Sequence, residues 1–199
     1  DANNIFETYL SHGFSPAGFF NEVVRFHRDS KESNFSIRRQ SEGVYAILSY
    51  LDYEKKHKRK HVEWEKRLKV ILDNFLRIQK ADGSFPRKFK DDFSIVDSTG
   101  GSTPSVTLPL VMAYKYFNDK RYLESAKRSA NYLENEIISK SDYFSSTLDA
   151  NCEDKEASLY AATATYYLAL VTKGSERLHY AELCKKAAYF ALSWYYTWD

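Results

Sequence analysis

Acidic residues are concentrated in one short stretch of the chain, STLDANCEDKEAS, which contains Asp149 and Glu156. Glu42 occupies a position similar to that of Glu156, because EGVYA at 42–46 matches EASLYA at 156–161 with one inserted residue. Two acids at equivalent helix starts would face each other across a cleft. Glycoside hydrolysis requires two carboxyl groups, one as general acid and the other as base or nucleophile. Asp149, Glu156 and Glu42 are therefore the candidate catalytic residues.

Helix capping is the alternative explanation for part of this acidic stretch. Asn151 is a strong N-cap residue, which would place Glu153 and Asp154 in the first turn of the following helix. Acids in a first turn complement the helix dipole. Capping leaves Asp149 and Glu156 without a structural explanation, so these two stay candidates for chemistry.

A metal site or a cysteine nucleophile is not favoured by the same stretch. An EF-hand calcium loop requires a glycine at its sharp turn, and no glycine follows Asn151. Zinc would require histidine and cysteine at short spacing, and Cys152 has no histidine near it in the sequence. Nothing in the sequence pairs Cys152 with a general base. We expect no metal and no cofactor.

Two further segments could bind substrate. Arg38 and Arg39 precede the helical pattern that starts near Glu42, and arginine binds carboxylates or sulfates bidentately. This keeps a lyase acting on an acidic polysaccharide open, although ion pairing with loop acids would equally explain the arginines. Asp97 begins the loop DSTGGSTP, which lacks the ending of a phosphate-binding P-loop and indicates a flexible cleft loop.

Aromatic residues are abundant, with 16 Tyr, 13 Phe and 3 Trp. A tyrosine ring packs against apolar surfaces while its hydroxyl forms hydrogen bonds, so this surplus suits a cleft that stacks against sugar rings. Tyr143, Trp194 and Trp198 are the candidates for such contacts. A tyrosine-rich core is the alternative, and the sequence leaves both open.

An internal repeat organises the elements that must position these residues. Trp64, Tyr122 and Tyr180 each lie near the start of an amphipathic helical pattern, 58 residues apart. Apolar or small residues recur four and eight positions later, on the same helix face. A segment that is apolar or small nearly all round precedes each copy, as in LPLVMAYKYF and SLYAATATYYLALV. The pattern predicts an inner helix followed by an outer helix, three times.

The expected fold is all-α, with stacked αα-hairpins forming part of an α/α toroid. We expect one domain or fragment over residues 1–199, with hairpins at 42–79, 105–138 and 157–198. The connections from outer to inner helices are long, which is typical of functional loops, and they should meet at the N-termini of the inner helices. Residues 1–41 are expected to be an irregular segment, in which residues 3–10 are interpreted as the end of a preceding outer helix. The rest forms either a small β-hairpin from 19–27 and 34–39 or a short helix at 16–25.

Charge and hydropathy exclude several classes of partner. The formal net charge is +2, and no basic block interleaves with aromatic residues, so we expect no nucleic-acid partner. No run of about 18 apolar residues occurs, so we expect no membrane span. The chain begins without methionine, which leaves the compartment open; a secreted or periplasmic chain whose signal has been removed is one interpretation.

The segment LDNFLRIQKADGSFP at 72–86 resembles a helix end found in the six-hairpin glycosidase superfamily of α/α toroids, and the closing WYYTWD is similar to aromatic segments of those proteins. The resemblance implies a carbohydrate substrate and glycoside hydrolysis. The alternatives are a polysaccharide lyase and a non-catalytic, carbohydrate-binding or scaffold toroid. Six hairpins need roughly twice this length at the observed period. We therefore expect the rest of a larger chain, or a second subunit, to complete the toroid.

Overall fold

A computed structural model describes residues 2–22, 34–144 and 152–195 of the chain. The described residues are predominantly helical, with one small antiparallel sheet, which confirms the predicted all-α class. The elements in chain order are α1 (Ala2–His12), β1 (Phe35–Ser36), α2 (Ile37–Lys56), α3 (Val62–Ile78), β2 (Lys88–Phe89), β3 (Ile95–Asp97), the 3₁₀ turn η1 (Gly100–Ser102), α4 (Thr103–Phe117), α5 (Lys120–Tyr132), the π-helical turn η2 (Leu133–Ile138), α6 (Lys155–Val171) and α7 (Gly174–Ser193).

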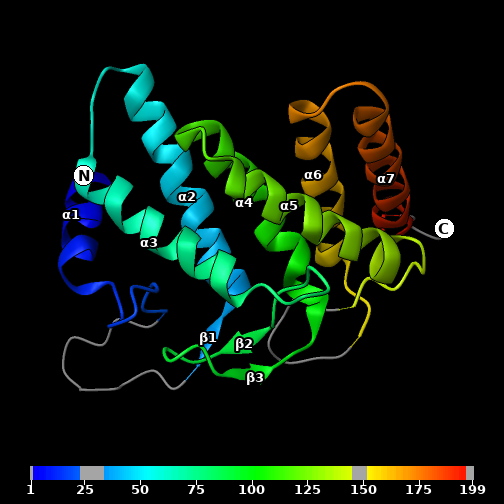
Figure 1. Cartoon of the computed structure of the whole chain (residues 1–199), viewed down its shortest axis with the longest axis horizontal. Helices are drawn as coiled ribbons and strands as arrows, with labels where there is room; N and C mark the ends of the chain where they lie inside the picture. The colour runs from blue at the N-terminus through cyan, green and yellow to red at the C-terminus, as the bar shows by residue number, and fades with distance from the viewer. Residues whose placement is uncertain (1, 23–33, 145–151, 196–199) are drawn as a thin grey trace.

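The helices form three consecutive hairpins, α2–α3, α4–α5 and α6–α7 (Figure 1). The inner helices α2, α4 and α6 pack side by side, with α4 in the middle. The N-terminal ends of all three lie at the end of the molecule where the sheet is found (Figure 1). The described parts of the long connections lie at this end, as predicted, because the turns within the hairpins are short and the chain returns through the outer helices.

The repeat of aromatic residues corresponds to the buried stripe of the outer helices. Trp64, Tyr122 and Tyr180 are all buried in α3, α5 and α7. Leu68 and Ala126, one helical turn further on, are buried in the same way. The large ring near each helix start and the small or aliphatic residue after it pack between the outer and inner layers, which places the core there.

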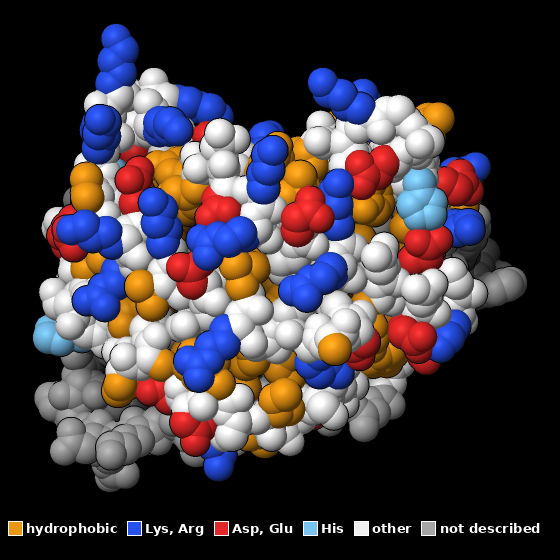
Figure 2. All heavy atoms as spheres, viewed as in Figure 1, with side chains coloured by type: hydrophobic (Ala, Val, Ile, Leu, Met, Phe, Trp, Pro, Cys, Tyr) orange, Lys and Arg blue, Asp and Glu red, His pale blue; other side chains and the backbone are white. Residues whose placement is uncertain are grey.

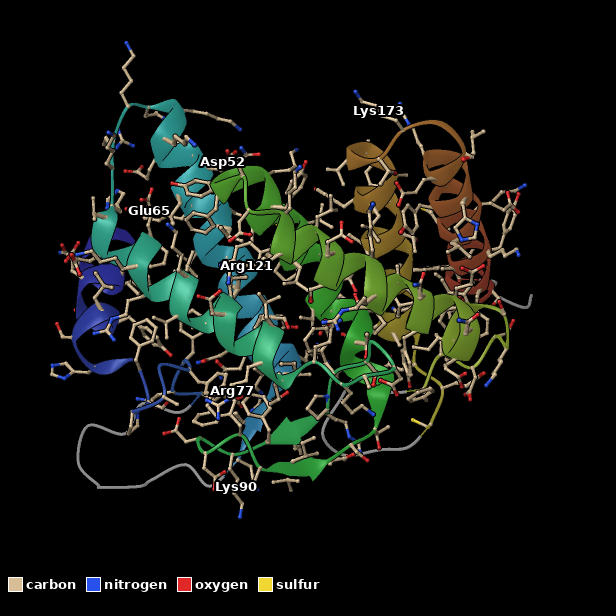
Figure 3. All side chains as sticks on the ribbon, in the orientation of Figure 1. Asp52, Glu65, Arg77, Lys90, Arg121 and Lys173 are labelled. Atoms are coloured by element: carbon tan, nitrogen blue, oxygen red, sulfur yellow. The ribbon has the colours of Figure 1, made fainter. Side chains whose placement is uncertain are left out.

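Charged residues cover the outward side of the hairpins. Figure 2 shows basic and acidic side chains interspersed over α3 and α5. Glu65 and Arg121 lie on these two helices (Figure 3). The hydroxyl of Tyr116 on α4 donates to the Glu65 carboxylate at 2.8 Å, and this bond fastens an inner helix to the neighbouring outer helix.

The segment that follows α3, residues 79–86, connects the outer helices α3 and α5. The Gln79 amide donates to the carbonyls of Gly83 at 2.9 Å and Ser125 at 3.0 Å, and it accepts from the Ser125 hydroxyl at 2.8 Å. Gly83 has a φ of +88°, and a Cβ there would lie 2.2 Å from the carbonyl oxygen of Arg128. Glycine is therefore required both by the backbone conformation and by the close approach of α5.

The sheet has the order β1–β2–β3 and is antiparallel throughout. Phe35 pairs with Phe89, so the strand near the N-terminus finds its partner after α3. The predicted hairpin between 19–27 and 34–39 is therefore wrong in its pairing, and its residues 23–33 lie outside the described part. The alternative helix at 16–25 is also wrong over residues 16–22, which form turns. Phe19 packs against Phe35 and Phe89 beneath the sheet, which explains the apolar residues there.

The expectation that residues 1–41 are irregular is wrong for their first part, because residues 2–12 form the helix α1, as the interpretation of residues 3–10 suggested. Two predicted helix starts also need correction. α2 begins at Ile37, before the expected residue 42, so Arg38 and Arg39 lie in its first turn. α6 begins at Lys155 with Asp154 as N-cap, whose carboxylate accepts from the Glu156 N–H at 2.8 Å. Aspartate caps as well as asparagine, and the backbone is extended at Asp154. The cap predicted at Asn151 falls outside the described residues.

Candidate active site

A cleft of about 410 Å³ lies across the N-terminal halves of the three inner helices. α2 contributes acidic and aromatic groups, α4 contributes small and apolar ones, and α6 contributes a second acid and a second tyrosine. The lining residues are Ser41, Glu42, Tyr45, Ser105, Leu108, Pro109, Glu156, Leu159, Tyr160 and Thr163. Two of the three predicted catalytic acids, Glu42 and Glu156, therefore border the same cleft.

Arg38 joins the two carboxylates. Its Nε donates to Glu42 Oε1 at 2.9 Å, and its Nη2 lies 2.8 Å from Glu156 Oε2. Arg38 and Glu42 are one turn apart on α2, whereas Glu156 reaches the guanidinium from the first turn of α6. The planar fork of an arginine can bind two carboxylates at once, and here it holds two acids from different helices together.

Tyr160 completes the cluster from α6. Its hydroxyl donates to Glu42 Oε1 at 2.6 Å, and the Arg38 guanidinium lies 5.6 Å from the centre of its ring. Burial, together with the neighbouring Glu42 carboxylate, raises the pKa of Tyr160 to about 12. The hydroxyl therefore remains protonated at neutral pH and acts as a hydrogen-bond donor.

The pKa of Arg38 is also raised. Burial disfavours its charge, but the Glu42 hydrogen bond and the nearby Tyr160 and Glu156 prevail and raise the pKa above its ordinary value. The cluster therefore keeps a permanent positive charge between two carboxylates. An anionic group of a ligand could take the place of either carboxylate on this cation.

α4 contributes Ser105, Leu108 and Pro109 to the lining of the cleft. Pro109 lies inside this helix and has no N–H to donate to the carbonyl of Ser105, four residues earlier. Both residues line the cleft. The Ser105 carbonyl thus lacks its usual helical donor from position 109.

The other predicted binding residues are distributed over the molecule. Arg39 points away from the cleft cluster and pairs with Glu22 at 3.1 Å. Asp97 pairs with Arg87, with its carboxylate 2.6 Å from the guanidinium. Tyr143 is buried with its ring 4.3 Å from that of Phe190, so it belongs to the core and is not available to a ligand.

The remaining predicted residues lie near the C-terminus or outside the described parts. Trp194 follows the end of α7 and is 49% exposed, but it does not line the cleft. Asp149 and Trp198 fall outside the described residues. Sequence reasoning missed Tyr160 as a site residue, although the shared motif at 42–46 and 156–161 already placed a tyrosine after each acid.

A larger cavity of about 550 Å³ lies at the other end of the inner helices. Its lining includes Asp52 and the lysines Lys55, Lys56 and Lys115. It has one carboxylate among these bases and therefore no acid pair.

Among the described residues, no group of three or more His, Cys, Asp or Glu side chains is arranged to hold a metal ion. No helix in the described parts is long and apolar enough to cross a membrane.

The stacked hairpins and the cleft at the starts of the inner helices define an α/α-toroid fold. A solved structure described as unsaturated glucuronyl hydrolase specific for heparin superposes with a TM-score of 0.69 at 14% sequence identity. The match covers 94% of this chain and 53% of that protein, so the chain spans about half the length of its structural neighbour. Neither the protein-family models nor the curated proteins contain a match. The likeness at this identity establishes the fold.

Proposed function

We propose that this chain belongs to a carbohydrate-active hydrolase that cleaves a glycosidic bond in an oligosaccharide or polysaccharide. Glu42 and Glu156 are the paired carboxylates of the reaction. One observation carries the proposal: a single guanidinium, Arg38, holds these two acids together at the mouth of one cleft. Carboxyl pairs in glycosidases are separated by about 5 to 9.5 Å, a range suited to acids that share one arginine.

Arg38 indicates the kind of sugar that the cleft would accept. A guanidinium binds a uronate carboxylate or a sulfate through two parallel hydrogen bonds. The structural neighbour acts on unsaturated glucuronyl groups, which carry a carboxylate. An acidic glycan is therefore the preferred substrate, with the apolar and tyrosine side chains of the cleft packing against sugar rings.

A polysaccharide lyase is the second candidate, since it also requires a cation next to an acidic sugar. Such an enzyme needs a base to remove a proton from the sugar, and Tyr160 is the tyrosine nearest Arg38 in the cleft. The raised pKa of Tyr160 keeps its hydroxyl protonated, which opposes a role as base. The acid pair at the cleft, together with the protonated Tyr160, therefore favours hydrolysis.

The proposal includes a second half-ring, supplied by further residues of a longer chain or by a second subunit. Tyr166 and Leu170 on α6 are 50% and 48% exposed, outside the cleft and on a helix face that no described element covers. Large apolar groups in such an arrangement mark surfaces that pack against another element. A partner there would also close the cleft on its open side.

The test is product analysis on a panel of neutral, uronate-containing and sulfated glycans. New reducing ends without new unsaturation support hydrolysis. New absorbance of unsaturated uronates would identify a lyase, and binding without product would identify a non-catalytic module. Glu42→Gln and Glu156→Gln should each lower turnover by roughly 10²- to 10⁴-fold. Glu63→Gln, on the exposed side of α3, is the matched control and should retain full activity. Asp149→Asn tests the third candidate acid; normal turnover would remove it from the catalytic role.

A further inference from the structure

We infer that Tyr160 is a positioning residue that, together with Arg38, determines which oxygen of each acid is presented to the ligand. This inference rests on the proposed function of Glu42 and Glu156. It extends that proposal by assigning Glu42 Oε2 and Glu156 Oε1 as the two reacting oxygens.

The two oxygens of Glu42 have different surroundings. Oε1 accepts from the Tyr160 hydroxyl at 2.6 Å and from Arg38 Nε at 2.9 Å. Oε2 has no hydrogen-bond partner among the described residues. A carboxylate oxygen with two strong donors is already satisfied, so a ligand proton or a water molecule would be met by Oε2.

Glu156 shows the same asymmetry with fewer donors. Its Oε2 lies 2.8 Å from Arg38 Nη2, and Oε1 has no side-chain donor in the parts of the chain that the structure describes. Each acid therefore has one oxygen held by the cluster and one oxygen left for a ligand. Both side chains line the same cleft, which is where a ligand would meet them.

Tyr160 is needed because Glu42 would otherwise be loosely held. The Glu42 side chain is 45% exposed, and without Tyr160 its link to α6 would be the indirect one through Arg38, which pairs with both Glu42 and Glu156. The bond from Tyr160 spans 118 residues of sequence and fixes Glu42 relative to the helix that carries Glu156. The separation of the two acids then depends on the Tyr160 hydroxyl together with the Arg38 guanidinium.

Removal of that hydroxyl gives the first test. Tyr160→Phe should lower kcat on the glycan that the wild-type protein cleaves by roughly 10- to 100-fold, with KM changed less than about 3-fold, because orientation is lost and the cleft keeps its shape. Tyr189→Phe, at an exposed tyrosine on the outer helix α7 that does not line the cleft, is the matched control and should leave both constants unchanged. A kcat of Tyr160→Phe within about 2-fold of wild type would overturn the inference.

A second test needs no substrate. Melting temperatures are compared for wild type, Tyr160→Phe, Glu42→Ala and the double variant. If the hydroxyl holds Glu42, the decrease for the double variant is smaller than the sum of the two single decreases. Additive decreases would show that the two side chains are independent, which also overturns the inference. A wild-type protein that cleaves no glycan, with coupled melting temperatures, would refute the proposed hydrolysis while leaving the Tyr160–Glu42 contact established.

Discussion

Replacement of Arg38 by methionine is the most direct test of the cluster that joins α2 and α6. Methionine keeps most of the aliphatic length of arginine, so packing near the Tyr160 ring is largely retained while the charge is removed. Two ion pairs are lost at once, those with Glu42 and Glu156. The two carboxylates are then left close together without a cation between them.

The expected cost follows from the exposure of the partners. The side chains of Glu42 and Glu156 are 45% and 48% exposed, and that of Arg38 is 21% exposed. Ion pairs between exposed groups contribute about 0.2 to 1 kcal/mol each, and solvent screening places these two in the lower half of that range. The sum is about 1 kcal/mol, which corresponds to a decrease in Tm of about 2 to 4 °C for a chain of this size.

The assay is thermal unfolding at low salt and at about 1 M salt, where the Debye length falls to about 3 Å. The difference in Tm between wild type and Arg38→Met should shrink at high salt. Arg177→Met, on the exposed side of α7, is the control and should show no comparable decrease. A variant as stable as wild type at low salt, or a difference that does not respond to salt, would refute the role of Arg38 as an electrostatic link.

Three further predictions address the frame around the site. Gly83→Ala should destabilise the fold by about 2 to 4 kcal/mol in chemical denaturation, because positive φ is strained for alanine and the new Cβ would meet the Arg128 carbonyl. Gly174 has a φ of +57°, and a Cβ there would meet nothing within 4 Å, so the control Gly174→Ala should lower the free energy of unfolding by only about 1 kcal/mol. An equal loss of stability in the two variants would contradict the close approach at Gly83. Burial opposes ionisation of Asp97, but hydrogen bonds from Thr99 and Arg87 prevail and lower its pKa to about 2. Since this pKa lies below the value of about 3.9 in an unfolded chain, the stabilisation is present above pH 4 and is lost as the pH falls toward 2. Asp97→Asn should therefore have a lower Tm at pH 7 and a weaker decline in Tm between pH 4 and 2; an unchanged acid profile would refute the assignment. Finally, if the exposed face of α6 around Tyr166 and Leu170 binds a second subunit, light scattering should show a dimer for the wild type. The double variant Tyr166→Glu/Leu170→Glu should then be a monomer. A wild-type monomer would favour completion of the ring by further residues of the same chain.

The corrections to the predicted helix boundaries have a common physical cause. Periodicity locates the middle of a helix, whereas its ends depend on local competition between caps and on contacts with distant segments. The register of β1 illustrates the second effect, since Phe35 pairs with Phe89 and is covered by Phe19. Alternation within residues 19–39 could not identify a partner that follows a complete helical hairpin.

The residues of the candidate site also differ in how far the sequence could predict them. Glu42 and Glu156 were predictable as a pair because both precede inner-helix patterns with a similar local sequence, and parallel inner helices bring their N-termini to one end. Arg39 and Tyr143 had residue types equally suited to binding, yet the first pairs with Glu22 and the second is buried against Phe190. Residue type does not indicate which side of a helix or loop faces a cavity.

The sequence by itself determined the helical class, the three hairpins and the end of the molecule where the long connections meet, because hydrophobic periodicity and repeat spacing are local properties of the chain. Only the tertiary structure placed Arg38 between Glu42 and Glu156 and brought the hydroxyl of Tyr160 to Glu42. The bond from Tyr160 to Glu42 joins residues that are 118 positions apart in the sequence. These contacts depend on how α2, α4 and α6 pack together, and no local pattern in the sequence encodes that packing.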